Sequence, residues 1–121
     1  MSIEKVRAYF KPLGIDGRIQ EFAVSSATVE LAAAAVGVEG ARIAKSLSFK
    51  VEDKPIVIVV AGDAKIDNAK YKAQFHAKAK MLTHQEAHTL IGHDVGGVCS
   101  FALPEEVRVY LDVSLRRFDT V

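Results

Sequence analysis

Apolar positions along the chain follow helical spacing in some stretches and strand alternation in others. The first helix is expected to begin after Ser2, with one apolar face made by Ile3, Val6, Phe10 and Leu13 at three- and four-residue spacing. Residues that cap helix N-termini also precede later stretches, and glycine ends two of them. These signals predict three more helices: 29–36 ending at Gly37, Asp67 to about Phe75, and Thr83 to Gly92.

Alternating and continuous apolar runs predict the strands. Over 43–51 side chains alternate, so Lys45 shares a face with the apolar residues of its own strand. Residues 52–55 are few enough for a hairpin turn into 56–61, whose unbroken β-branched run is typical of a strand buried on both faces. Shorter strands are expected over 18–24, near 79–82 and over 107–112.

The order of these elements predicts the fold class. Helices and strands interleave, which favours an α/β or α+β fold. The hairpin makes part of the sheet antiparallel, so we expect a mixed β-sheet wrapped by helices. With 121 residues, no repeat and no linker, the chain is predicted to be a single domain spanning residues 1–121.

Composition narrows the location and the partners. Half of the residues are hydrophobic and the net charge is +1, which argues against disorder and against a general nucleic-acid coat protein. No apolar stretch approaches the roughly 20 residues that span a bilayer, and the N-terminus lacks a signal-peptide pattern. One cysteine excludes an internal disulfide framework. We therefore expect a cytoplasmic protein without membrane contact.

Lysines are concentrated in one segment despite the low net charge. Residues 64–80 hold a single acid, Asp67, and five lysines: Lys65, Lys70, Lys72, Lys78 and Lys80. Such a patch attracts a polyanion such as a nucleic acid. The alternative is the solvated face of a helix.

Lys45 is the first candidate for chemistry. A lysine on an apolar strand face is costly unless its ammonium reaches water or meets an anion. One interpretation is that Lys45 stands at the strand end and extends to solvent. The other is a pocket lysine that neutralises a phosphate or polarises a carbonyl.

The loop over 92–101 is the second candidate. Adjacent Gly96 and Gly97 let the backbone approach a ligand, and successive N–H groups there could bind an oxyanion. A plain flexible connection is the alternative. The loop is not a phosphate-binding P-loop, because Val98 and Cys99 replace the Lys-Ser/Thr pair, and no nucleophile elbow is present.

Two weaker patterns involve cysteine and histidine. Cys99, with His93 nearby in sequence, could act as a thiolate nucleophile, although a lone cysteine is more often a small buried hydrophobe. His84 and His88 have the i, i+4 spacing of zinc-protease helices, but Gln85 occupies the place of the required glutamate. No metal site and no cofactor are therefore expected.

Two stretches carry a resemblance to a known family. Residues 41–50 resemble the lysine-bearing strand of the YbaK-type aminoacyl-tRNA editing domains, and residues 91–101 resemble their glycine loop. This family includes free-standing prolyl-tRNA and cysteinyl-tRNA(Pro) deacylases and the editing insertion of prolyl-tRNA synthetase. Residues 60–63, 90–93 and 109–112 also fit, so the resemblance covers nearly the whole chain.

The resemblance implies an aminoacyl-tRNA deacylase. It would hydrolyse the ester that joins a wrong amino acid to the terminal ribose, with alanyl, cysteinyl or seryl groups, most simply on tRNA(Pro), as the expected substrates. Lys45 would face the tRNA 3′ end, and Gly96 and Gly97 would hold the aminoacyl carbonyl. Positioning and an oxyanion contact could suffice without a protein nucleophile.

The resemblance also implies a binding surface and partners. Substrate-binding positions would be His93, Val98, Cys99, Ser100 and Asp112. The acceptor stem would be held by Lys65, Lys70 and Lys72. The implied partner is an aminoacylated tRNA. The protein would act either alone or docked on an aminoacyl-tRNA synthetase, and the sequence leaves both alternatives open.

Two departures from the family pattern open an alternative. The family loop usually reads Gly-x-x-x-Pro, whereas Ser100 stands four residues after Gly96, which leaves the loop looser. Family members usually continue past the position of Val121, so we expect the usual C-terminal strand and helix to be lacking and one sheet edge to be open. The expected consequence is a homodimer across that edge or a partly disabled enzyme. The alternative function is a non-catalytic relative that binds a tRNA end, a nucleotide or a protein.

Overall fold

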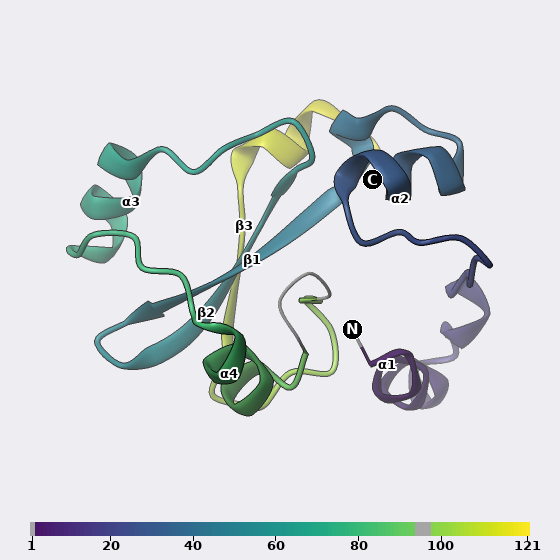
Figure 1. Ribbon diagram of the computed structural model, residues 1–121, viewed down its shortest axis with the longest axis horizontal. Coiled ribbons are helices and arrows are strands. Elements are labelled where there is room, and N and C mark those ends of the chain that lie inside the picture. The colour runs from purple at the N-terminus through teal and green to yellow at the C-terminus, as the bar shows by residue number, and fades with distance from the viewer. Residues whose placement is uncertain (1, 94–97) are drawn as a thin grey trace.

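A three-stranded mixed sheet forms the centre of the protein. The computed structural model describes residues 2–93 and 98–121 (Figure 1). The strands are β1 (Ala44–Val51), β2 (Lys54–Ala61) and β3 (Arg108–Leu111), in the order β1-β2-β3. β1 pairs with β2 antiparallel and β2 pairs with β3 parallel. The predicted mixed, partly antiparallel sheet is confirmed.

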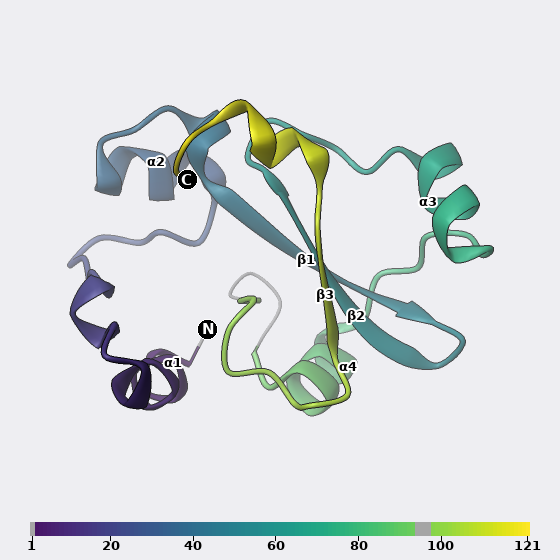
Figure 2. The same ribbon diagram turned by 180° about the vertical axis from the view of Figure 1, so that it is seen from behind.

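Helices surround this sheet on several sides. The α-helices are α1 (Ile3–Phe10), α2 (Val29–Val36), α3 (Asn68–Phe75) and α4 (His84–Glu86), the last continuing as the π-helical turn η4 (Ala87–Ile91). Shorter 3₁₀ turns are η1 (Lys11–Leu13), η2 (Asp16–Arg18), η3 (Gly40–Arg42) and η5 (Val113–Arg117). The sheet lies between α3 on one side and α1 and α2 on the other, as Figure 2 also shows from behind.

Capping residues fix where the helices begin. The side chains of Ser2, Thr28 and Asp67 each accept a hydrogen bond from the backbone N–H three residues later. Thr83 and Glu86 form the predicted capping box. Because these signals are local, the predicted helices over 29–36 and from Asp67 to Phe75 agree with the structure.

Strand β2 is buried on both of its faces, as its apolar run predicts. On one face Val57 and Val59 pack with two residues of η4, Ala87 and Ile91, and with Leu82 and Val107 from the flanking segments. On the other face Ile56, Ile58 and Val60 pack with Phe49 of β1 and Tyr71 of α3. These two clusters form the hydrophobic core that the sheet divides.

The β1–β2 hairpin turns through two residues. Glu52 and Asp53 have φ values of 50° and 64°, and the flanking residues Val51 and Lys54 are paired. A two-residue turn of this handedness matches the twist of antiparallel strands. The ladder consequently runs without interruption to its far end, where Lys45 lies opposite Val60.

Two of the predicted strands are wrong. Residues 18–24 form no strand: Asp16–Arg18 is a 3₁₀ turn and the next residues are irregular and mostly exposed. This segment lies between α1 and α2, away from the sheet, so it has no partner edge (Figure 1). Residues 79–82 touch the outer edge of β1, but they form only an isolated bridge between Met81 and Phe49. The strand predicted over 107–112 is confirmed as β3.

An ion pair fastens α4 to the outer edge of β1. Lys50 on β1 pairs with Glu86, and this hydrogen bond lowers the pKa of Glu86 to about 2, with help from the backbone N–H of Thr83. The opposite edge of the sheet, formed by β3, is more exposed to solvent. Within the described chain β3 pairs with β2 alone, and Val109 and Leu111 are exposed.

No helix in the described part of the chain is both long enough and apolar enough to cross a membrane.

The chain leaves β2 through a very close backbone contact at Gly62. A Cβ atom at this position would lie 2.1 Å from the carbonyl oxygen of Gly40 in η3 and 2.8 Å from Cγ1 of Val29 in α2. Real Cβ atoms do not tolerate such distances, so only glycine fits here. The contact brings η3 and the start of α2 against the end of β2.

Gly62→Ala should therefore destabilise the protein. We expect the free energy of unfolding to fall by about 1–3 kcal/mol, the usual range for overpacking, because backbone and not a flexible side chain must move. Urea unfolding followed by circular dichroism measures this. Gly17→Ala is the matched control, since a Cβ at Gly17 meets no atom within 4 Å. Equal unfolding midpoints for the two variants would contradict the steric account.

Candidate active site

A pocket of about 330 Å³ lies between β1 and the N-terminal end of α2. One wall is made by residues 26–29 and Ala32, the other by residues 43–48, and Met81 and Val98 complete the lining. Its volume is at the lower end of the roughly 300–1,000 Å³ found for small-molecule sites. Most of the lining side chains are alanine, serine or threonine, so the pocket is narrow and weakly polar.

Lys45 is the one charged residue among those that line this pocket in the described part of the chain. Strand alternation places it opposite Val60, on the apolar face that packs against α3. Its ammonium is partly buried and donates a hydrogen bond to the carbonyl oxygen of Ala64 at 2.8 Å. This contact leaves the charge unneutralised and other N–H donors available. Lys45 is among the residues that line the pocket, but its ammonium is held at Ala64, which is not one of them, so its role as a pocket lysine stays a prediction.

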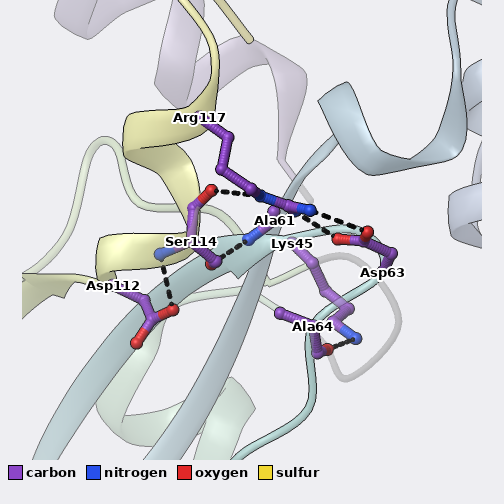
Figure 3. A network of polar contacts seen from close by, with 7 residues as sticks. All are labelled: Lys45, Ala61, Asp63, Ala64, Asp112, Ser114 and Arg117. Carbon is purple, nitrogen blue, oxygen red and sulfur yellow. Dashed lines mark hydrogen bonds and ion pairs between the residues drawn. The ribbon is translucent and has the colours of Figure 1, made fainter.

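An arginine–aspartate pair lies next to Lys45 (Figure 3). Both carboxylate oxygens of Asp63 accept hydrogen bonds from the guanidinium of Arg117, at 3.0 and 2.5 Å. These hydrogen bonds lower the pKa of Asp63 and raise that of Arg117. The positive charge of Lys45 also contributes a little to the lowered pKa of Asp63. Asp63 is thus firmly ionised.

The turn η5 holds Arg117 in place. Asp112 caps η5 by accepting from the backbone N–H of Ser114 at 3.0 Å, which lowers the pKa of Asp112. The Ser114 hydroxyl accepts from the backbone N–H of Ala61 at 3.0 Å, and Arg117 Nε donates to the Ser114 carbonyl oxygen at 3.0 Å. These contacts attach η5 to the end of β2 and direct the guanidinium toward Asp63 (Figure 3).

His93 is almost completely buried, at 1% exposure. Its Nδ1 accepts from the backbone N–H of Ser2 at 3.2 Å, and its Nε2 lies 2.9 Å from the carbonyl oxygen of Phe101. Together these partners require the tautomer with hydrogen on Nε2. His93 thereby links the start of α1 to the chain after the glycine loop. Both nitrogens have partners within the protein, and its substrate-binding role stays a prediction.

The structure brings together only part of the predicted site. Val98 lines the pocket with Lys45, whereas the half-buried Cys99 and Ser100 do not line it. Asp112 serves as the cap of η5. Gly96 and Gly97 lie outside the described residues, so their predicted roles stay open.

The predicted tRNA-binding lysines are all exposed. Lys65 directly follows Ala64, and Lys70 and Lys72 continue along α3. Within the described residues no group of three or more histidine, cysteine, aspartate or glutamate side chains is placed to hold a metal ion.

Sequence reasoning missed two parts of this site. Residues 26–29 carry a visible helix cap at Thr28, but nothing local shows that the same residues form a pocket wall. The Asp63–Arg117 pair joins residues 54 positions apart, for which a single sequence gives no signal.

Comparison with known proteins identifies the family. The model of the aminoacyl-tRNA editing domain matches residues 24–121, which include β1, Lys45 and the whole pocket. This chain belongs to the aminoacyl-tRNA editing domain family.

Individual relatives agree with this assignment. The uncharacterized protein YwhH of Bacillus subtilis (strain 168) is 52% identical to this editing domain over 122 residues, covering all of this chain and 78% of YwhH. Proline--tRNA ligase of the same organism is 29% identical over 90 residues, or 74% of this chain and 16% of the ligase. The chain therefore spans a small part of that enzyme.

Solved structures show the same fold. A crystal structure of a protein proposed as a trans-editing enzyme for prolyl tRNA synthetase superposes with a TM-score of 0.86 and 28% identity, covering 97% of this chain and 75% of that one. The editing-domain fold predicted from the resemblance is confirmed.

The thiol of Cys99 should react slowly. Burial raises its pKa above the ordinary value for a thiol, so the thiolate fraction at neutral pH is lower than in an exposed cysteine. We expect alkylation by iodoacetamide at pH 7 to be slower in the folded protein than in urea, and its pH midpoint to be higher. Because Cys99 is the one cysteine, mass spectrometry reads it directly. Faster alkylation of the folded protein would reveal an activated thiol.

Proposed function

We propose that this editing domain is a trans-editing hydrolase. It cleaves the ester between a wrong amino acid and the terminal ribose of a tRNA, with alanyl-, cysteinyl- or seryl-tRNA(Pro) as the expected substrates. The observation that carries the proposal is the placement of Lys45 in a domain of the editing family: this residue of β1 lines the pocket, and its ammonium is hydrogen-bonded to a carbonyl oxygen instead of a carboxylate.

The chemistry requires little from the protein. Water attacks the ester carbonyl, the carbon–oxygen bond to the ribose breaks, and the ribose hydroxyl leaves with a proton. An aminoacyl ester is already activated, so positioning and stabilisation of the developing oxyanion are the main needs. Lys45 is suited to bind the terminal phosphate or the carbonyl oxygen, and Gly96 and Gly97 are expected to hold the carbonyl. The raised pKa of Cys99 supports a mechanism without a thiolate nucleophile.

The dimensions of the pocket support a small amino acid. Its lining includes Ala27, Ala32, Ala44 and Ser46, and its volume of about 330 Å³ is at the lower end of the range for small-molecule sites. Size exclusion is effective against larger groups. Between substrates that differ by one methylene, however, a pocket discriminates by only about 1–3 kcal/mol. The choice among alanyl, cysteinyl and seryl groups therefore needs direct measurement.

The lysine-rich segment supports tRNA as the partner. The carbonyl that binds Lys45 belongs to Ala64, and Lys65, Lys70 and Lys72 follow it as exposed cations on the way into α3 and along it. A polyanion whose 3′ end enters the pocket would meet these charges along its backbone. The proposal includes a cytoplasmic location and a prolyl-tRNA synthetase as the enzyme whose errors are corrected. A homodimer across the exposed edge of β3 is a further expectation.

A second candidate is a non-catalytic member of the family that binds the tRNA end. Ser100 favours it, because serine stands where the family usually has the proline that stiffens the loop. The same substitution separates the two candidates. If the protein only binds, loss of Lys45 weakens association and there is no turnover to lose.

Lys45→Ala should abolish hydrolysis. On a panel of misacylated tRNAs that starts with alanyl- and cysteinyl-tRNA(Pro), we expect turnover to fall at least about 100-fold, the usual cost of removing one oxyanion-stabilising donor. Lys54→Ala removes the same charge from the exposed start of β2 and is the matched control. Folded wild-type protein that hydrolyses no member of the panel, while binding it through Lys45, would instead establish the binding-only candidate.

Removing two α3 lysines should weaken tRNA binding without changing the amino acid preference. For Lys70→Ala/Lys72→Ala, the slope of log affinity against log salt concentration should flatten by about 1.5, because two phosphate contacts no longer release counterions. Filter binding over a salt series measures the slope. Lys11→Ala/Lys54→Ala is the charge-matched control. Equal slopes for both double variants would place the tRNA elsewhere.

A further inference from the structure

We propose that Arg117 is a positioning residue for Lys45. By holding the carboxylate of Asp63, it prevents that carboxylate from pairing with the Lys45 ammonium and keeps the ammonium available to the substrate. The inference rests on the proposed function in so far as Lys45 is assigned there to the tRNA 3′ end.

Two cations and one carboxylate meet at the end of β2. Lys45 Nζ donates to the carbonyl oxygen of Ala64, the residue directly after Asp63. The ammonium is therefore held at the residue next to the one that carries the carboxylate, and the charge of Lys45 makes the smallest of the contributions to the lowered pKa of Asp63. Figure 3 shows Lys45 arriving from β1 and Arg117 from η5. Besides Arg117, Lys45 is the cation whose charge acts on Asp63, so without Arg117 the carboxylate could turn to Lys45.

Arg117 binds Asp63 in preference to Lys45 because of the geometry of its guanidinium. The planar guanidinium binds both oxygens of Asp63 at once, whereas an ammonium is a point charge that cannot match the two oxygens in this way. Arg117 is also pre-positioned, because its Nε is bound to the Ser114 carbonyl and Ser114 is bound to Ala61. The Arg117 side chain therefore loses little conformational entropy when it pairs with Asp63.

The exposure of the pair argues that its role is more than structural. The side chains of Arg117 and Asp63 are 48% and 49% exposed. Ion pairs that are this open to solvent contribute little to folding stability. Removing Arg117 should thus affect the lysine beside it far more than the fold.

A variant cycle tests the inference on the full chain. Arg117→Ala should lower kcat/KM for the hydrolysed aminoacyl-tRNA about tenfold, with an unchanged unfolding midpoint. Asp63→Asn should leave it near the wild-type value, because no carboxylate remains to capture Lys45. The double variant Arg117→Ala/Asp63→Asn should recover most of the lost activity. Arg116→Ala, the same charge change at an exposed neighbour on η5, is the control and should have no such effect.

The opposite pattern would overturn the inference. If the pair were merely structural, Arg117→Ala and Asp63→Asn would be equally harmful and the double variant would not recover. If Arg116→Ala caused the same loss as Arg117→Ala, general attraction of tRNA would explain both.

A second readout does not depend on turnover. An amine-directed acylating ester should label Lys45 more slowly in Arg117→Ala, because an ion-paired ammonium loses its proton less readily, and at the wild-type rate in the double variant. Lys65 provides an internal reference in the same peptide map. If wild-type protein hydrolyses no substrate, the proposed function fails, and the labelling rates alone decide the inference: an unchanged rate in Arg117→Ala would end it.

Discussion

The burial of β2 on both faces is the constraint on which the rest of the structure depends. Six consecutive apolar residues, Ile56 to Ala61, can leave water only if layers cover both sides of the strand. Helix α3 packs on one side, and η4 packs on the other. β1 and β3 satisfy the two backbone edges of β2. The position of each other element follows from how it covers or borders this strand.

The candidate site lies at the end of the buried strand β2. Gly62 allows η3 and α2 to approach the backbone, which forms the pocket wall opposite β1. In the register of the hairpin, Lys45 lies opposite Val60, one residue pair from the end of the β1–β2 ladder. Its ammonium reaches the carbonyl of Ala64 rather than a carboxylate. Strand β1, through its pairing with the core strand β2, thus places a lysine at the rim of the core.

Sequence patterns predicted the parts of this arrangement that depend on neighbours in the chain. Helix caps at Thr28 and Asp67, the hairpin and the doubly buried strand all follow from local rules. The strand predicted over 18–24 was wrong because strand formation needs the edge of another strand to pair with, and local composition does not show whether one is near. Strand alternation and the family resemblance both pointed to Lys45 but not to Arg117, since the Asp63–Arg117 contact exists only once η5 is attached to β2 by Ser114. The pocket wall at 26–29 could not be predicted either, because the local sequence there shows only the helix cap at Thr28.

Under the proposed function, a pocket of this kind is a sufficient selector for an editing enzyme. A hydrolase that corrects errors must spare the correct aminoacyl-tRNA and remove a smaller, wrong group. Rejection of a larger group by sterics is strong, because packed walls such as the one at Gly62 do not yield easily. Rejection of a smaller group is weak, at about 1–3 kcal/mol for one methylene. Under this proposal, a small pocket lined largely by alanine and serine is selective in the direction that editing requires.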